Sequence, residues 1–204
     1  MLHEDLFYTA REAAEIMRDA LTTEAGDIPS IHANKVKGLI EAGRLTNASD
    51  NAWMKVSGVE LAAFIEDTRY VTADELLENH PLIYRVSVTP RHESAVYNED
   101  GILRRFAGVD FSDDPDSDDE LGGWEGVWPI AESKIDELIE KEGLLLASFR
   151  GYVAPGHLRE ISEAEAVGSR WYFHTRPARR DVIEFVGSGL WIDIPDGPIS
   201  DFIA

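Results

Sequence analysis

The chain contains no cysteine, which excludes disulfide bonds and metal sites built from thiolates. Long apolar runs are also absent, because no stretch approaches the roughly 18 residues that mark a membrane-spanning helix. Residues 1–5 lack the basic and then apolar pattern that opens a secretory signal. We therefore expect a cytoplasmic protein that neither follows a standard export route nor enters a membrane.

Positive charge is scarce in this chain. Lysines and arginines number 19 against 39 aspartates and glutamates, which gives a formal net charge of −20. Residues 1–70 hold 7 basic and 12 acidic residues, whereas residues 71–204 hold 12 and 27. A body this acidic is repelled by a nucleic-acid polyanion at long range. If it binds DNA, we expect few phosphate contacts, a log–log salt slope of about −3 to −4, and reliance on base contacts, a dimer or a partner.

Apolar sequence is sufficient for a hydrophobic core, since 44% of the 204 residues are apolar and 9% are aromatic. Two capping boxes mark helix starts in the first part of the chain. Residues 9–12 (TARE) predict a helix that begins at Ala10, and residues 57–60 (SGVE) predict another that carries Leu61 and Phe64. A helix between them, followed by a short polar hairpin, gives the order of a winged helix-turn-helix.

The helix around which this part is organised is predicted in residues 30–45. Ser30 is the expected N-cap, and Gly43 supplies the left-handed residue that ends the helix. Apolar residues at near-helical spacing form one face: Ile31, Val36, Leu39 and Ile40. The other face carries short polar and basic side chains: His32, Asn34, Lys35 and Lys37. Such side chains suit base edges and phosphates, so we interpret this segment as a recognition helix.

Three stretches resemble the MerR-type, excisionase-like winged helix-turn-helix domains: residues 8–14 (YTAREAA), 36–45 (VKGLIEAGRL) and 53–57 (WMKVS), the last followed by Leu61 and Phe64. The resemblance covers roughly the first 70 residues. It implies a second helix that enters the major groove and a wing that touches the DNA backbone. By position it implies groove contacts from Ser30, His32, Asn34 and Lys35, and backbone contacts from Lys37, Arg44 and Lys55.

The sequence departs from this family between the first two helices, where residues 18–29 replace a tight turn. Either the first helix is longer and a loop bulges out, or the angle between the two helices differs. We divide the chain into the winged helix-turn-helix at 1–70, a linker helix at 71–80 and an acidic α+β domain at 81–204. The predicted fold class is therefore mixed α+β, with an antiparallel sheet in the carboxy-terminal domain.

The carboxy-terminal domain shows strand patterns but resembles no family that we identify. Strands are expected at residues 83–88, 144–153, 170–174 and 190–194, with a hairpin at 95–103 that turns at 99–101. A helix is expected at 134–142, capped by Ser133, and a short turn at 162–165. Residues 187–189 are expected to form the turn before the last of these strands.

Several motifs with possible chemistry occur in this domain. An EF-hand-like spacing has its ligand positions 1, 3, 5 and 12 at Asp114, Asp116, Asp118 and Glu125. Its sixth position is Asp119, where the sharp turn requires glycine, so a solvated acidic loop is favoured. Asp116, Glu132 and Lys134 have the letters of a metal-dependent nuclease motif, although Ser133 is expected to start a helix there. The histidines lack paired spacing, and only folding can bring His157 and His174 together with an acid.

No nucleophile elbow or phosphate-binding glycine loop is present. The basic cluster of Arg176, Arg179 and Arg180 is expected to pair with nearby carboxylates rather than to bind a ligand. We therefore predict no catalytic residue, no metal and no cofactor. The sequence favours a protein that binds double-stranded DNA sequence-specifically, as a transcription regulator or an excisionase-like recombination accessory factor.

The carboxy-terminal domain is then expected to serve dimerisation, effector binding or recruitment of a protein partner. Its acidity favours a solubility adaptation, because the carboxylates are scattered along faces expected to be solvated. Two alternatives stay open. The first is an acidic protein-interaction module or DNA-mimic inhibitor, and the second is a metal-dependent enzyme that acts on nucleic acid.

Overall fold

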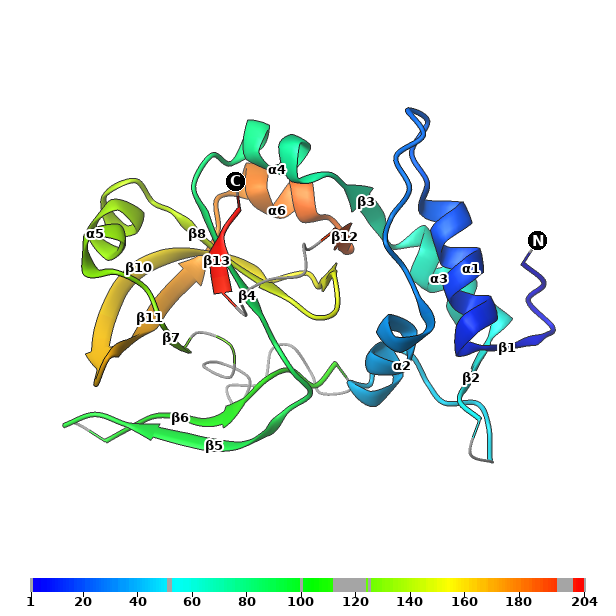
Figure 1. Cartoon of the computed structure of the whole chain (residues 1–204), viewed down its shortest axis with the longest axis horizontal. Helices are drawn as coiled ribbons and strands as arrows, with labels where there is room; N and C mark the ends of the chain where they lie inside the picture. The colour runs from blue at the N-terminus through cyan, green and yellow to red at the C-terminus, as the bar shows by residue number, and fades with distance from the viewer. Residues whose placement is uncertain are drawn as a thin grey trace.

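The computed structural model describes residues 2–50, 53–99, 101–111, 124, 126–193 and 200–203. In this part of the chain the fold is mixed α+β, as the sequence predicted, and it contains six helices and several sheets. The first three helices lie at one end of the molecule, and most of the strands lie at the other (Figure 1).

Five elements make up the amino-terminal end: β1 (Phe7–Thr9), α1 (Ala10–Leu21), α2 (Ala33–Glu41), β2 (Lys55–Ser57) and α3 (Gly58–Glu66). The strands β1 and β2 pair antiparallel, with Tyr8 opposite Val56. The three helices pack their apolar faces together, and Met17, Leu39 and Leu61 are all 0% exposed. This burial fixes α2 against α1 and leaves only part of its circumference for other contacts.

The two predicted helix starts in this part are confirmed. Thr9 caps α1 in a reciprocal capping box with Glu12. Ser57 caps α3 by accepting a hydrogen bond from the Glu60 N–H at 3.2 Å. The Glu60 carboxylate accepts from the Thr46 N–H at 2.8 Å, so it anchors the segment between α2 and β2.

The sequence predicted the end of α2 correctly but not its start. Ser30 does not cap the helix, because the N-cap is His32, without a side-chain hydrogen bond. The Ser30 N–H instead donates to Asp193 Oδ1 at 2.7 Å. The predicted stop at Gly43 is confirmed by its φ of 75° and by the hydrogen bond from the Arg44 N–H to the Leu39 carbonyl at 2.9 Å.

The unusual connection between α1 and α2 forms a loop that projects beyond the end of α1 (Figure 1). Thr23 and Asp27 close it, since the Thr23 N–H donates to the Asp27 carbonyl at 3.0 Å and the Asp27 N–H donates to Thr23 Oγ1 at 3.0 Å. The helix α1 is 12 residues long. A bulging loop therefore absorbs the extra residues.

The largest sheet has the strand order β13-β4-β8-β10-β11-β7. These strands are β13 (Ser200–Phe202), β4 (Ile83–Ser87), β8 (Leu144–Ser148), β10 (Leu158–Val167), β11 (Arg170–Pro177) and β7 (Gly126–Trp128). The pair β4 and β8 is parallel and the other pairs are antiparallel, so the sheet is mixed rather than purely antiparallel. Two helices follow strands of this sheet: α5 (Glu132–Glu140) after β7 and α6 (Arg180–Val186) after β11.

Most predicted strands of this domain are present. Three predictions for this domain need correction, which concern a strand, a turn and a helix cap. The predicted strand at 144–153 is two strands, β8 and β9 (Tyr152–Val153), separated by a tight turn. The predicted turn at 162–165 is wrong, because these residues lie inside β10, where a register shift between Ile161 and Glu163 interrupts the alternation. The cap at Ser133 is also wrong, since α5 begins earlier, with Ala131 as N-cap. The hairpin is confirmed as β5 (His92–Tyr97) and β6 (Ile102–Ala107).

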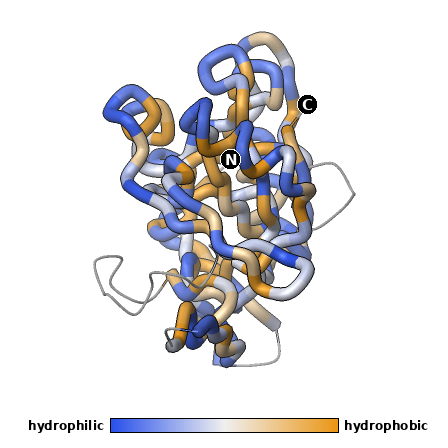
Figure 2. Tube along the Cα trace, turned by 90° about the vertical axis from the view of Figure 1, so that its left-hand side faces the viewer, coloured by the Kyte–Doolittle hydropathy of each residue, from blue (hydrophilic) through white to orange (hydrophobic). Residues whose placement is uncertain are grey.

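The amino-terminal end and the large sheet are joined by more than the connecting chain. A three-stranded sheet joins them, in which β12 (Leu190–Ile192) lies between β3 (Arg69–Val71) and β9, and α4 (Ala73–Asn79) follows β3. Here β12 pairs with β3 in parallel and with β9 antiparallel. One cluster of buried side chains runs from Met17 in α1 to Trp191 in β12. In the hydropathy-coloured trace, hydrophobic segments accordingly run through the middle of the molecule (Figure 2). The predicted domain division stays a prediction.

Candidate nucleic-acid interface

The helix α2 has three differently used faces. Val36 and Leu39 are buried in the core that it shares with α1 and α3. A second face is turned toward the carboxy-terminal half, where Gly38 lies against Arg150 and the carbonyl of the C-cap Ala42 accepts a hydrogen bond from the Phe111 N–H at 2.8 Å. A narrow stripe stays exposed to solvent, formed by residues three and four apart on the helix: Asn34, Lys37 and Glu41.

Of the seven predicted DNA-contacting residues, three lie in or beside this exposed stripe and a fourth lies on β2. His32, Asn34 and Lys37 are exposed, and Lys55 is half-buried on β2. Across the β1–β2 pair, Lys55 lies near Glu12. The pKa of Glu12 is lowered, chiefly by the hydrogen bond that its carboxylate accepts from the Thr9 N–H at 2.8 Å and to the smallest extent by the charge of Lys55.

The other three predicted residues make contacts within the protein. Ser30 donates its backbone N–H to Asp193, as described above, although the residue itself is exposed. Lys35 donates from Nζ to the Ser30 carbonyl at 2.6 Å, and its Nζ lies 5.5 Å from the Trp191 ring centroid. Arg44 donates from Nε to the Tyr152 hydroxyl at 3.0 Å, and its guanidinium lies 4.7 Å from the Phe64 ring centroid. These contacts attach α2 to the carboxy-terminal half.

The segment between α2 and β2 occupies the place of the predicted wing. Its two sides are linked by the Ala48 N–H, which donates to the Lys55 carbonyl at 2.8 Å, and by Asn47 Oδ1, which accepts from the Lys55 N–H at 3.2 Å. Trp53 on this segment is 74% exposed. Trp53 is not among the predicted contact residues, although an aromatic residue beside a polar run was the available signal.

A second unselected residue lies against α2 from outside the amino-terminal end. The Arg150 side chain, in the turn between β8 and β9, covers Gly38 of α2, and Arg150 is exposed. A Cβ at Gly38 would lie 3.0 Å from Arg150 Cγ. Local sequence pattern carries no sign of this contact, because the two residues are distant in the chain.

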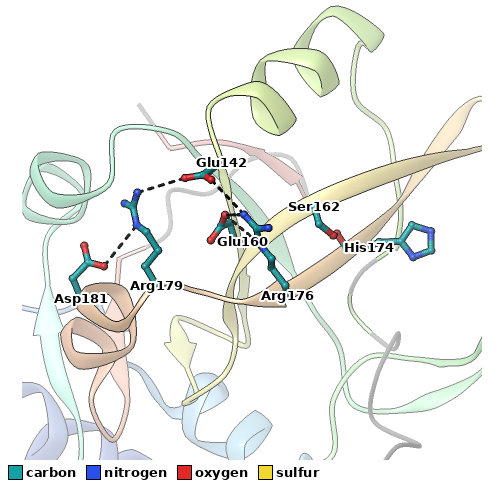
Figure 3. A network of polar contacts seen from close by, with 7 residues as sticks. All are labelled: Glu142, Glu160, Ser162, His174, Arg176, Arg179 and Asp181. Atoms are coloured by element: carbon teal, nitrogen blue, oxygen red, sulfur yellow. Dashed lines mark hydrogen bonds and ion pairs between the residues drawn. The ribbon is translucent and has the colours of Figure 1, made fainter.

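The basic cluster of the carboxy-terminal half is paired internally, as the sequence predicted (Figure 3). Arg176 binds the buried Glu160, with Nε donating to its carboxylate at 3.2 Å, and this bond chiefly raises the pKa of Arg176. Arg179 lies 3.7 Å from both Glu142 and Asp181. Such pairing leaves little positive charge at this cluster for an anionic ligand.

In the described part of the chain, the residues of the remaining candidate sites do not come together as a catalytic or metal-binding group. The four EF-hand-like positions, and Asp116 of the nuclease-like motif, lie outside the described residues. Lys134 lies in the first turn of α5 and pairs with Glu137 at 2.8 Å. Among the residues that the structure describes, no group of three or more histidines and carboxylates is placed to hold a metal ion.

The two histidines singled out in the sequence have different surroundings. His157 packs between Phe111 and Trp124, at ring-centroid distances of 5.7 and 5.4 Å. Burial, with a smaller effect of the charge on Arg159, lowers the pKa of His157 to about 4. His174 lies 3.5 Å from Glu165.

Comparisons with known proteins give no relative on which to base an assignment: no family model matches the chain, and neither a curated protein nor a solved structure does. In the described part of the chain, every helix is too short or too polar to cross a membrane.

Proposed function

We propose that the protein binds double-stranded DNA sequence-specifically through a winged helix-turn-helix in residues 1–70. The order of β1, α1, α2, the connecting segment, β2 and α3 supports this assignment, as does the pairing of β1 with β2. In this proposal α2 is the recognition helix and the segment around Trp53 is the wing. The protein then acts as a transcription regulator or as an excisionase-like recombination accessory factor.

The observation that carries the proposal is the solvent-facing stripe of α2. Asn34 and Lys37 point away from both packed faces of the helix and are exposed. Asparagine can pair with the edge of adenine, and lysine can meet a phosphate or guanine. In the described part of the chain, neither Lys37 nor Lys55 has a carboxylate oxygen within 4.0 Å, whereas Lys134 and Lys141 both pair with Glu137. The unpaired lysines thus belong to the proposed DNA-binding end.

The carboxy-terminal half has a supporting role in this proposal. Its Tyr152, Trp191 and Asp193 hold Arg44, Lys35 and Ser30 in place. We assign it dimerisation, effector binding or partner recruitment, because its own basic cluster is neutralised internally. Its high negative charge limits nonspecific DNA binding, so specific base contacts contribute a large share of the affinity.

The test is selection from a random duplex library at low salt with the full-length protein. We expect one sequence to be enriched. Asn34→Ala should weaken binding to the selected site by about 1–3 kcal/mol and relax preference at one position. Lys37→Ala should weaken binding to all sequences alike. Lys141→Ala, which removes the same charge at the C-cap of α5, is the matched control and should bind as the wild type does.

The contacts that Ser30, Lys35 and Arg44 make with the carboxy-terminal half favour one alternative, in which α2 is a scaffold that joins the two halves and the acidic surface binds a basic protein. The same selection separates the two functions. If no sequence is enriched and Asn34→Ala and Lys37→Ala behave as the wild type does, the DNA-binding proposal is wrong and the scaffold function is favoured.

A further inference from the structure

Arg150 lies in a tight turn whose backbone disfavours arginine. Phe149 and Tyr152 exchange both of their backbone hydrogen bonds, at 2.8 and 2.9 Å, so the turn has only Arg150 and Gly151 at its centre. Their φ angles are 57° and 103°. Two-residue hairpin turns with positive φ at both central positions favour asparagine, aspartate and glycine. A residue held in an energetically unfavourable backbone conformation often has a functional role.

The side chain of Arg150 occupies the place of a missing side chain on α2. A Cβ added to Gly38 would lie 3.0 Å from Arg150 Cγ and 3.1 Å from its Nε. Gly38 follows Asn34 by four residues and precedes Glu41 by three, so it borders the exposed stripe of the helix. The arginine therefore lies alongside the stripe that carries Asn34 and Lys37.

The charge of Arg150 is not neutralised within the described part of the protein. There, it has no carboxylate oxygen within 4.0 Å and its side chain makes no hydrogen bond, whereas Arg176, Arg179 and Arg180 are each paired. The residue is exposed. A guanidinium next to a recognition helix can bind phosphate with two parallel hydrogen bonds.

We propose that Arg150 is a phosphate-contacting residue of the DNA interface, supplied by the carboxy-terminal half at the position where α2 itself has only Gly38. The inference rests on the proposed DNA-binding function and extends it. The DNA-binding surface is then composite, made of α2 and the β8–β9 turn. The carboxy-terminal half contributes a charge directly and does not serve only as a support.

Two substitutions in the full-length protein test this role. Arg150→Asn removes the charge but suits the turn, so thermal unfolding should occur at the same or a higher temperature. Affinity for the selected duplex, measured by fluorescence anisotropy, should fall about 3- to 10-fold, and the log–log salt slope should become less negative by about 1. Arg150→Lys should keep the wild-type slope, and the control Lys141→Ala should change neither quantity.

The outcomes separate the inference from the function on which it rests. If the wild type selects a site and Arg150→Asn binds it with unchanged affinity and slope, Arg150 does not contact DNA, while the proposed function stands. If Arg150→Asn lowers both affinity and unfolding temperature but leaves the slope unchanged, Arg150 only supports α2, and the inference is again wrong. If the wild type selects no site, the proposed function fails and the inference fails with it.

Discussion

Arg44 and Tyr152 join the two halves of the protein, with the arginine Nε–H donating to the tyrosine hydroxyl at 3.0 Å and the guanidinium lying 5.3 Å from the ring centroid. Tyr152 is 1% exposed, so its hydroxyl is removed from bulk water. The contact fixes the residue that follows the glycine stop of α2. It therefore ties the end of the proposed recognition helix to the β8–β9 turn.

Tyr152→Phe should destabilise the protein by about 1–2 kcal/mol, because it removes a hydrogen bond to a charged donor while keeping the ring contacts. Urea unfolding measures this change in free energy. Tyr97→Phe is the matched control, since Tyr97 is 62% exposed on β5, and it should leave stability unchanged. An unchanged free energy of unfolding in Tyr152→Phe would show that the hydrogen bond from Arg44 contributes nothing to stability.

Gly38→Leu should destabilise the protein by about 1–3 kcal/mol through overpacking. A Cβ alone would lie 3.0 Å from Arg150 Cγ and 3.3 Å from Phe149 Cε1, so a larger side chain must displace both. Adding Arg150→Asn to Gly38→Leu should restore part of the lost stability. Thermal unfolding of the two single variants and the double variant measures the coupling, and strictly additive effects would contradict the contact.

Asn34→Leu is the control for that experiment, because it adds a side chain of the same kind to the exposed stripe of α2. We expect its free energy of unfolding to stay within about 0.5 kcal/mol of the wild type.

Stability should fall as the pH drops from about 6.5 to 4, partly because of His157. His157 is half-buried, with its ring Nδ1 removed from solvent, and this burial lowers its pKa to about 4, so the unfolded chain takes up a proton before the folded protein does. This contribution is fully present above the unfolded pKa and is lost progressively below it, on the order of 3 kcal/mol in total.

The measurement is the free energy of unfolding from pH 7 to pH 4 for the wild type and for His157→Phe. The variant should lose less stability over this range, because it cannot bind the proton. Parallel curves for the two proteins would show that His157 titrates normally in the folded state.

Glu60→Ala should loosen the proposed wing. The carboxylate of Glu60 accepts the Thr46 N–H at 2.8 Å, and its loss should cost about 1 kcal/mol and speed amide hydrogen exchange at Thr46. Glu66→Ala, an exposed carboxylate at the end of α3, is the control and should leave that exchange rate unchanged. Equal exchange rates in all three proteins would contradict an anchoring role for Glu60.

The features that the sequence predicted correctly depend on neighbouring residues. Thr9 and Ser57 cap their helices because the amide that each satisfies lies three residues away. Gly43 ends α2 because glycine accepts a positive φ without steric cost. Ser30 was misassigned because its N–H bonds to Asp193, which lies 163 residues further along the chain. Nothing near Ser30 signals that partner.

In the candidate site, too, the correctly predicted features depend on neighbouring residues and the missed ones on residues distant in the chain. The exposure of Asn34 and Lys37 follows from the helical spacing of the buried Val36 and Leu39. The contacts that Lys35 and Arg44 make within the protein do not follow from helical spacing, since their aromatic partners lie on β12 and β9. The strand β10 was missed because a register shift after Ile161 breaks its two-residue alternation. Tertiary contacts therefore decide which basic residues of α2 face solvent.

The parallel pairing of β3 with β12 also affects the order in which the protein becomes complete during synthesis. The strand β3 leaves the ribosome well before β12, and at about 5–20 residues per second the gap from Val71 to Leu190 takes on the order of 10 s. During that interval Ser30 and Lys35 lack Asp193 and Trp191. A nascent chain stopped before Leu190 would thus carry the complete sequence of the proposed helix-turn-helix with these contacts unmade.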